Sequence, residues 1–419
     1  MRGFRTAWQV DKTMLQVAGG TYLEVCHVPE WHHIYGSGAR AACAASLLCG
    51  ATELHTFVGS DYEPDLRALC DTFSVSLHVQ QVPRTIAFHY FHGLSTPTVV
   101  PLIHTLKSHP VMTVRGEAVL RFGMLEGSAL IEAARVVYDP QSVFDPMPFS
   151  ENGSRTEHLA VVLNRNEARA LVGDLAPDAL ADGILASMGA EIVIVKQGAE
   201  GALLVTKSGT REHIDAFETP AVFPIGSGDV FSAAFAALWA AEKVDPVPAA
   251  RFASLAAAHY CSTRSLPIPT SESDIRAAVP GLAALPPRKR PGARRCYLAG
   301  PFFDLGQRWV IEEAKAALES QGLSVFSPLH DVGHGQAQVV VPQDLKALDE
   351  VDIAFGLVDG LDPGTLFELG YARSKGIPVV ALVQQEQGES LKLLTGSGCR
   401  IETDFTTAIY RTNWVSRQT

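Results

Sequence analysis

One carboxylate, Glu368, lies in the segment DPGTLFELGYA (residues 362–372), where a helix entering its apolar stripe ordinarily buries hydrocarbon. Thr365 stands three residues before it, and this spacing fits a capping box, in which a Thr and a Glu side chain satisfy free amides of the first turn. The other interpretation is chemical, because an ionised carboxylate can attack an electrophilic carbon. The segment alone leaves both interpretations open.

A second candidate group follows a glycine-rich turn in FPIGSGDVFSAAF (residues 223–235). Gly226, Ser227 and Gly228 allow the backbone to turn tightly into a helix, so that several amides point outward where an anion is stabilised. Asp229 comes next, and a carboxylate beside a bound phosphate makes sense if it takes a proton from an attacking hydroxyl group. Taken alone the motif is weak, since such a turn is more often a plain helix cap.

The elements that must position these groups alternate between strand and helix along the whole chain. Apolar runs such as EIVIVKQG (191–198) and IPVVALV (377–383) favour parallel strands covered by helices, so the predicted class is α/β. The segment LPPRKRPGARR, rich in Pro and Arg, precedes a fresh strand and predicts a domain boundary. We therefore predict domains at 1–284 and 296–419, joined by a linker at 285–295.

Composition narrows the function classes. With 419 residues, 47% of them hydrophobic, each domain is long enough to bury its own core. The net charge of -11 argues against nucleic acid or an anionic membrane as partner and favours a small-molecule substrate. The first residues lack the apolar core of a signal peptide, and the 7 cysteines form no CxxC pair, so we expect a cytoplasmic protein without disulfides or a cysteine zinc site.

In the C-terminal domain the polar residues follow the predicted strands. In a small doubly wound sheet, ligands bind beyond the carboxyl ends of the strands. We therefore expect a site around Glu368 that includes substrate-binding residues from three of these loops: Gly300, Phe302, His330, Asp331 and Asp359. His330 and His334 have HxxxH spacing, but their loop contains Gly residues and is not predicted to be helical. A loop that shapes the substrate site is favoured there over a metal site.

The segments YLAGPFF, VFSPLHDVG, VDIAFGLVDGLDPGTLFELGYA and GIPVV resemble the nucleoside 2-deoxyribosyltransferase family in order and spacing. The resemblance implies a flavodoxin-like (Rossmann-like) sheet in which Glu368 attacks the anomeric carbon of a nucleoside. It also implies that Asp352 and Asp362 hold or protonate the base and that Tyr297 orients the nucleophile. At the amino end of a helix, Glu368 should stay ionised. Members of the family share sites between subunits, so we expect a homo-oligomer.

The N-terminal domain resembles the PfkB sugar kinase family through GSGARAACAASLLCGA (36–51), VVLNRNEARALVG (161–173) and VIVKQGAEGALLV (193–205). The resemblance implies a ribokinase-like fold with a lid at 84–97, and ATP and Mg²⁺ as cofactors. Asp229 would be the catalytic base and Gly226 to Gly228 the anion hole. The resemblance also implies sugar binding by Gly36 and Gly38. It implies nucleotide and phosphate binding by five further residues, of which Glu167 also organises Mg²⁺ indirectly: Asn164, Glu167, Lys196, Gly198 and Gly201.

The sugar contacts depart from the PfkB pattern. Glu24 stands where the family has an Asp, and Arg40 and Ala41 stand where the sugar-binding loop usually carries an Asn. Because the phosphate-binding segments are kept while the sugar contacts have changed, we expect phosphoryl transfer to an unusual acceptor. The sequence thus predicts a bifunctional enzyme of nucleoside metabolism. The alternative is a nucleotide-sensing pseudokinase domain that regulates a deoxyribosyltransferase or N-glycosidase.

Overall fold

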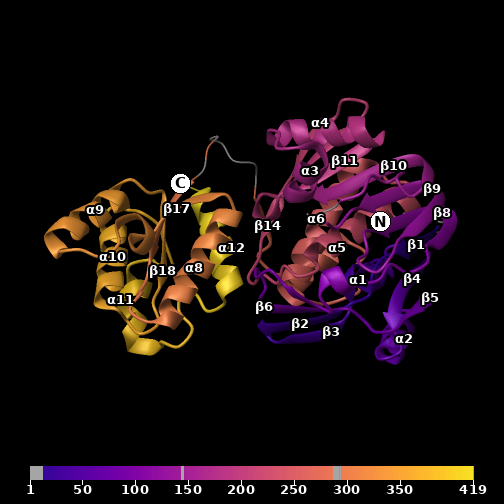
Figure 1. The fold of residues 1–419 in the computed structure, drawn as a ribbon. Helices are drawn as coiled ribbons and strands as arrows, with labels where there is room; N and C mark the ends of the chain where they lie inside the picture. Colours follow the sequence, from indigo (N-terminus) through magenta and orange to yellow (C-terminus); the bar gives the residue numbers. More distant parts are fainter. Residues whose placement is uncertain (1–12, 143–145, 286–291, 293, 419) are drawn as a thin grey trace, which may run out of the picture. The chain divides into compact units, whose positions relative to one another are not determined.

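The computed structural model describes residues 13–142, 146–285, 292 and 294–418, which divide into two compact units (Figure 1). The N-terminal unit ends at Ala284, and the C-terminal unit runs from Leu285 to the chain end and also includes two short segments, His92–Ser95 and Pro220–Phe223. Most of the predicted linker, 285–295, lies outside the described residues. Each unit has its own sheet and is described separately.

The N-terminal unit is built on a mixed sheet of nine strands. In sheet order the strands are β13 (Arg211–Ile214), β12 (Ala202–Thr206), β11 (Ile192–Lys196), β10 (Arg155–Asn164), β9 (Ala129–Asp139), β8 (Met112–Phe122), β1 (Met14–Ala18), β4 (Ala51–Gly59) and β5 (Val75–Val82). All neighbours from β11 to β5 pair in parallel, whereas β12 and β13 are antiparallel.

The parallel strands form because their residues are apolar on both faces. The run from Ala160 to Leu163 in β10 is fully buried, as is typical of a central parallel strand. Because β9, β10 and β11 run in parallel, their last residues lie along one edge of the sheet: Asp139, Asn164 and Lys196. Ligands are expected at this carboxyl edge.

Among its described residues, seven α-helices and two small sheets complete the N-terminal unit. The helices are α1 (Gly36–Ala45), α2 (Glu63–Thr72), α3 (Arg165–Val172), α4 (Pro177–Met188), α5 (Ser227–Phe235), α6 (Pro246–Thr263) and α7 (Glu272–Ala278). A four-stranded sheet has the order β3 (Trp31–Ile34), β2 (Leu23–Val28), β6 (Ala87–His92) and β7 (Thr98–Val100), so the predicted lid segment contributes β6. A two-stranded sheet pairs β14 (Ala216–Glu218) with β15 (Ala283–Leu285).

The C-terminal unit has a five-stranded parallel sheet. Its order is β17 (Leu323–Phe326), β16 (Arg294–Ala299), β18 (Ile353–Leu357), β19 (Val379–Leu382) and β20 (Arg400–Glu402). Numbered within the unit this order is 2-1-3-4-5, the flavodoxin-like order of doubly wound sheets. The predicted α/β class is therefore confirmed for both units.

Helices cover both faces of this sheet (Figure 1). On one face, α8 (Leu305–Ser320) and α12 (Phe405–Ser416) share a buried apolar cluster with the strands. On the other face the cluster includes α9 (Ala337–Asp349), α10 (Pro363–Ser374) and α11 (Lys392–Gly396). Among the described helices of either unit, none combines the length and the apolar character that crossing a membrane requires.

Candidate functional sites

The amino end of α10 is capped by Asp362 and not by Thr365. The Oδ2 atom of Asp362 accepts hydrogen bonds from the Thr365 amide at 2.7 Å and from the Thr365 hydroxyl at 2.9 Å. Glu368 therefore takes no part in a capping box with Thr365, and it lies in the second turn of the helix, which begins at Pro363. The capping interpretation of Glu368 is wrong, because the chain turns into the helix earlier than the sequence pattern indicated.

Glu368 instead pairs with Tyr297 of β16. The hydroxyl of Tyr297, a fully buried residue, donates to Oε1 of Glu368 at 2.8 Å. Within the described residues Glu368 makes no other side-chain hydrogen bond, which leaves Oε2 free to react. Burial raises the pKa of Glu368 to about 7, with the Tyr297 hydrogen bond acting in the opposite direction. The helix end, which we expected to keep Glu368 ionised, is therefore opposed by burial, and Glu368 lies one turn further into the helix than expected.

A further carboxylate, Asp344 on α9, belongs to this site although sequence reasoning missed it. Its charge helps to raise the pKa of both Glu368 and Tyr297, and its helix α9 shares one buried cluster with α10 and Tyr297. Its Oδ1 atom is buried without a hydrogen-bond partner among the described residues, and burial raises its own pKa. The sequence feature that indicates Asp344 is the segment PQDLKALDE, in which an acidic residue lies in the first part of a helix that covers the sheet.

Asp352 does not join Glu368. It precedes β18 at the amino edge of the sheet, where its carboxylate accepts from the Arg295 amide at 2.8 Å and from Arg294 Nη1 at 3.2 Å. The expected role of Asp352 beside the base is therefore wrong, because the length of β18 separates Asp352, at the amino edge of the sheet, from the carboxyl edge. Asp362 does lie near, since its charge also raises the pKa of Glu368.

The remaining predicted residues of this unit mostly shape loops. Asp331 accepts from the Ser327 amide at 2.8 Å, and Asp359 accepts from the amides of Gln384 and Gln385. His330 contacts Glu312 Oε1 at 2.9 Å through Nε2. A side chain at position 300, in place of Gly300, would press against Leu357. The ring of Phe302 contacts the ring of His334 edge-on, with centroids 5.9 Å apart. His330 and His334 thus have separate neighbours, in keeping with a shaping loop.

In the N-terminal unit the glycine turn enters α5 as predicted. Gly226 has φ of 81°, a left-handed conformation that favours glycine, and α5 begins at Ser227. A Cβ atom on Gly228 would lie 3.3 Å from Nζ of Lys196, so the ammonium group stands beside the first turn. Helix amides and an ammonium group at one place form a site suited to phosphate.

Arg40 occupies the space beside this turn. Its buried guanidinium donates to Glu24 Oε1 at 2.8 Å through Nη1, also pairs with Glu24 Oε2, and donates to Asp229 Oδ2 at 3.0 Å. A Cβ atom on Gly226 would collide with the guanidinium at 2.2 Å. Gln141 donates to the other oxygen of Asp229, Oδ1. The structure therefore brings Glu24, Arg40 and Asp229 together, with both oxygens of the predicted base engaged.

Asp139, at the end of β9, is the second carboxylate that sequence reasoning missed. It accepts from Lys196 Nζ at 2.6 Å and from the Ser232 hydroxyl at 2.8 Å, while its Oδ1 is buried with no partner among the described residues. Burial raises the pKa of Asp139 and, together with the charge of Asp139, raises the pKa of Glu167 to about 7. Crowded buried carboxylates of this kind fit a divalent cation.

The other predicted residues of the N-terminal unit have structural partners as well. Asn164 and Glu167 form the capping box of α3, so at least part of their role is to start that helix. A Cβ atom on Gly38 would meet the Gly19 backbone at 2.5 Å, which lets α1 approach β1 closely. The remaining predicted glycines, Gly36, Gly198 and Gly201, have positive φ angles in tight turns.

Two family models match the chain. The model described as pfkB family carbohydrate kinase matches residues 156–272, and the model described as nucleoside 2-deoxyribosyltransferase matches residues 296–404. Both expected family resemblances are confirmed for these ranges. Among curated proteins, none matches the chain.

Several solved structures resemble the chain at low identity. Ribokinase from Thermotoga maritima is 18% identical with a TM-score of 0.45, covering 64% of this chain and 99% of that chain. Aminoimidazole riboside kinase from Salmonella enterica, solved with aminoimidazole riboside and an ATP analogue, is 16% identical with a TM-score of 0.48 (63% and 99%). Ribokinase from Arabidopsis thaliana, complexed with ribose and ATP, is 19% identical with a TM-score of 0.48 (64% and 99%). At these values the likenesses carry no argument about activity.

Proposed function

We propose that this chain, which joins a PfkB carbohydrate kinase domain (156–272) to a nucleoside 2-deoxyribosyltransferase domain (296–404), breaks the N-glycosidic bond of a nucleoside at the second domain. The observation that carries the proposal is the Tyr297–Glu368 pair, with the charge of Asp344 acting on both residues. One carboxylate is held by a buried hydroxyl with its second oxygen free, and another is biased by burial toward its protonated form. These are the two groups that glycosidic cleavage requires.

The reaction follows from these positions. Oε2 of ionised Glu368 attacks the anomeric carbon, the bond from that carbon to the base nitrogen breaks, and its electron pair leaves with the base. A proton from Asp344 neutralises the departing base, and Asp362, whose charge also acts on Glu368, is the second candidate for this role. The sugar stays bound to Glu368 as an ester until water or a second base attacks the same carbon and releases the carboxylate. Tyr297 acts as a positioning residue that holds the nucleophile.

Mass spectrometry of the intact protein tests this assignment. After exposure to a panel of ribo- and deoxyribonucleosides, the parent protein should gain the mass of one sugar residue, and peptide mapping should place the adduct on Glu368. Glu368→Gln should show no adduct and no release of free base, because an amide is a very poor nucleophile. Glu389→Gln, at an exposed position of the same unit, serves as the matched control. Base release by Glu368→Gln at the parental rate would overturn the proposal.

For the N-terminal domain we propose phosphoryl transfer from ATP to a hydroxyl group of a nucleoside or sugar. The amides of Gly226 to Gly228 and the Lys196 ammonium would hold the phosphates, and Asp139 and Glu167 would hold Mg²⁺, directly or through water. When bound, Mg²⁺ neutralises charge on the transferring phosphate. Asp229 first gives up its hydrogen bond from Arg40 or from Gln141 and accepts one from the acceptor hydroxyl instead. It then takes the proton of that hydroxyl group.

The alternative for this domain is a nucleotide sensor that regulates the second domain, and one observation favours it. Both oxygens of Asp229 are engaged, by Arg40 and Gln141, so the base is masked in this structure. Asp229→Asn should reduce phosphoryl transfer by about 10²-fold or more while sparing nucleotide binding. Asp71→Asn, on the exposed surface, is the control. If the parent binds ATP without transferring phosphate to any sugar or nucleoside tested, the sensor is the correct function.

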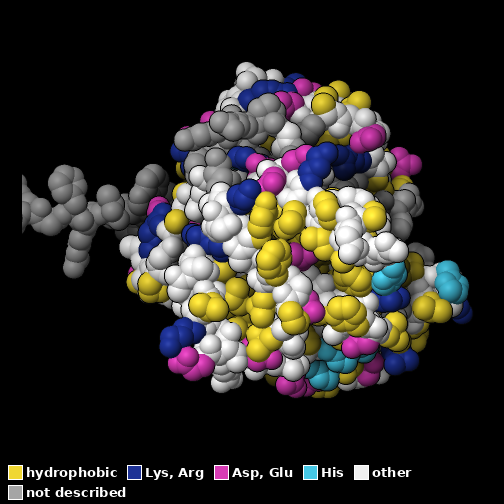
Figure 2. Space-filling view, turned by 90° about the vertical axis from the view of Figure 1, so that its left-hand side faces the viewer, with side chains coloured by type: hydrophobic (Ala, Val, Ile, Leu, Met, Phe, Trp, Pro, Cys, Tyr) yellow, Lys and Arg dark blue, Asp and Glu magenta, His cyan; other side chains and the backbone are white. Residues whose placement is uncertain are grey.

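A homo-oligomer remains our expectation for the assembly. The C-terminal unit exposes large apolar side chains, including Phe303, Leu305, Phe367 and Leu393. On the face of the molecule seen in Figure 2, hydrophobic side chains gather with charged residues of both signs around them. Sedimentation of the purified chain measures its oligomeric state, and a monomer at micromolar concentration would contradict the expectation.

A further inference from the structure

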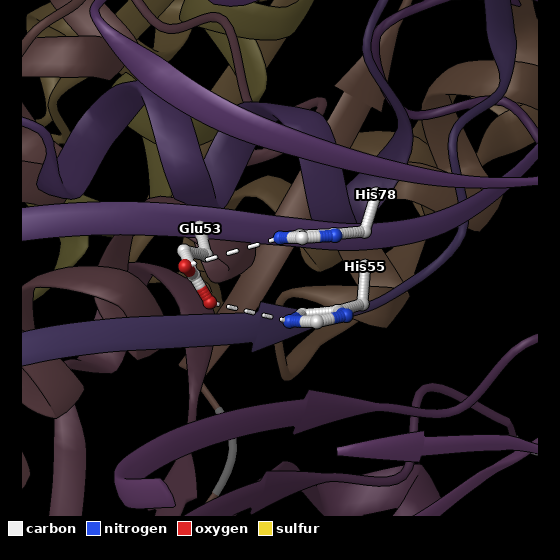
Figure 3. Close-up of side chains that lie close together, drawn as sticks. All are labelled: Glu53, His55 and His78. Atoms are coloured by element: carbon white, nitrogen blue, oxygen red, sulfur yellow. Dashed lines mark ion pairs between the residues drawn. The ribbon is translucent and has the colours of Figure 1, made fainter. Parts of the chain in front are cut away.

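Three side chains on the large sheet of the N-terminal unit converge on one point. Glu53 and His55 lie on the same face of β4, and His78 on the edge strand β5 is the direct register partner of His55. Nε2 of each histidine faces one carboxylate oxygen of Glu53 (Figure 3). The ligand atoms of the three residues all lie within 4.8 Å of one another.

The distances in this cluster are too long for hydrogen bonds. Nε2 of His55 lies 3.6 Å from Oε2 of Glu53, and Nε2 of His78 lies 3.9 Å from Oε1. Nε2 of His55 is buried and has no hydrogen-bond partner among the described residues. Two ligands of a tetrahedral zinc ion, each about 2.0–2.2 Å from the metal, lie about 3.3–3.6 Å apart. Rotation of the two rings, which stack with an interplanar angle of 8°, would point both imidazole nitrogens at one ion and bring the three groups to coordination distance.

The surroundings prepare the groups as ligands. The rings of His55 and His78 stack with centroids 4.6 Å apart. Gln16 on the neighbouring strand β1 donates from Nε2 to Oε2 of Glu53 at 2.9 Å and so orients the carboxylate. Hydrogen bonds of this kind to ligating groups typically tune metal affinity.

We propose that Glu53, His55 and His78 bind one divalent ion of the zinc class. Two imidazoles and one carboxylate suit Zn²⁺, and a fourth position is left for water or an added ligand. The site belongs to β4 and β5 and shares no residue with the phosphate-binding turn or with Glu368. A bound ion would join the edge strand β5 to β4 and stabilise the folded state by mass action.

Calorimetric titration with Zn²⁺ of the full chain, first freed of metal by dialysis against a chelator, tests the site. The parent should bind one Zn²⁺ per chain, with a rise in melting temperature. His78→Ala, at a half-exposed position, should weaken binding by about 100-fold or more, and Gln16→Leu by about 10- to 100-fold. His104→Ala, on an exposed segment, is the matched control for Zn²⁺ bound loosely by surface histidines.

Two outcomes would overturn the proposal. One is equal affinity and equal thermal stabilisation in His78→Ala, His104→Ala and the parent, since the bound Zn²⁺ would then lie elsewhere. The other is an X-ray absorption spectrum of the zinc-loaded parent that shows no imidazole ligands. Glu53→Gln gives an independent check, because it keeps the side-chain shape and the capacity to accept from Gln16 while removing the ligand charge.

Discussion

Burial raises the pKa of Glu368 to about 7. Only its ionised form attacks carbon, whereas the acid that neutralises the departing base must be protonated. We therefore expect kcat/KM for base release to rise with a midpoint at about 7 as Glu368 ionises and to fall again where the acid loses its proton. A pH profile of nucleoside cleavage measures this midpoint. A midpoint near 4.5, the ordinary value for Glu, would mean that this carboxylate titrates in water and is not the nucleophile held by Tyr297.

Replacing Tyr297 tests the same site through its positioning residue. The hydroxyl of Tyr297 lowers the pKa of Glu368, so Tyr297→Phe should move the acidic limb of the profile upward. The expected shift is about one unit, because a hydrogen bond to a charged group is worth about 1.5 kcal/mol. Tyr371→Phe, which removes a hydroxyl bonded to Asp349 on the same unit, should leave the profile unchanged. Lower activity with an unshifted limb would assign Tyr297 a purely structural role.

At the scale of the elements, Asp362 has two proposed roles: it caps the helix α10, and it is a candidate acid for the departing base. Asp362→Ser keeps an oxygen that can accept from the Thr365 amide, whereas Asp362→Ala loses the cap at a cost of about 1 kcal/mol. We expect chemical unfolding to show a stability loss in the Ala variant only. If Asp362 also serves the departing base, both variants should release base more slowly than the parent. Parental activity in the Ser variant would leave Asp362 with the cap alone.

The strands of the C-terminal unit could be predicted from the sequence because long aliphatic runs are typical of buried parallel strands. Proline usually marks the first turn of a helix, and Pro342 would place the start of α9 there, but the helix begins at Ala337 and Pro342 lies inside it. The strand β20 was not predicted because it has only 3 residues and one aliphatic side chain. Local patterns thus identified elements with strong periodicity and missed the rest.

The sites were predictable in part for a related reason. Glu368 and Asp229 stand in local motifs, and the sequence pattern identified both. Asp139 and Asp344 could not be identified in this way, because each depends on a neighbour that is distant in sequence. Asp139 pairs with Lys196 from another strand, and Asp344 acts on Glu368 from another helix. Asp352 was misplaced because family resemblance does not say at which end of a strand a carboxylate lies.

For the whole molecule the open question is which reaction precedes the other. A kinase acting on a nucleoside 5′-hydroxyl would make a nucleotide that the second domain could split into base and sugar phosphate, and tethering would raise its local concentration. Arg373 donates to the carbonyls of Ser397 and Ile377, whereas Arg308 donates to the carbonyl of Phe302, a residue predicted to bind substrate, and is the candidate contact for a phosphate. We therefore expect the kinase reaction first.

Glu368→Gln protein supplied with ATP and a nucleoside separates the two orders. Kinase-first chemistry should accumulate the nucleoside 5′-phosphate, which chromatography and mass spectrometry detect. Asp229→Asn in the same background should leave the nucleoside unchanged. An untouched nucleoside in the single variant, with a free sugar still phosphorylated by the same protein, would reverse the order.

The buried guanidinium of Arg40 also constrains how this chain can change over generations. It pairs with both Glu24 and Asp229 in a place nearly closed to water, where losing one partner of a buried pair costs about 3–5 kcal/mol. Arg40 and Glu24 should accordingly be inherited as a pair, and descendants that lose one should have replaced the other. A change of acceptor in this lineage would then arrive through coordinated substitutions and not through a single step.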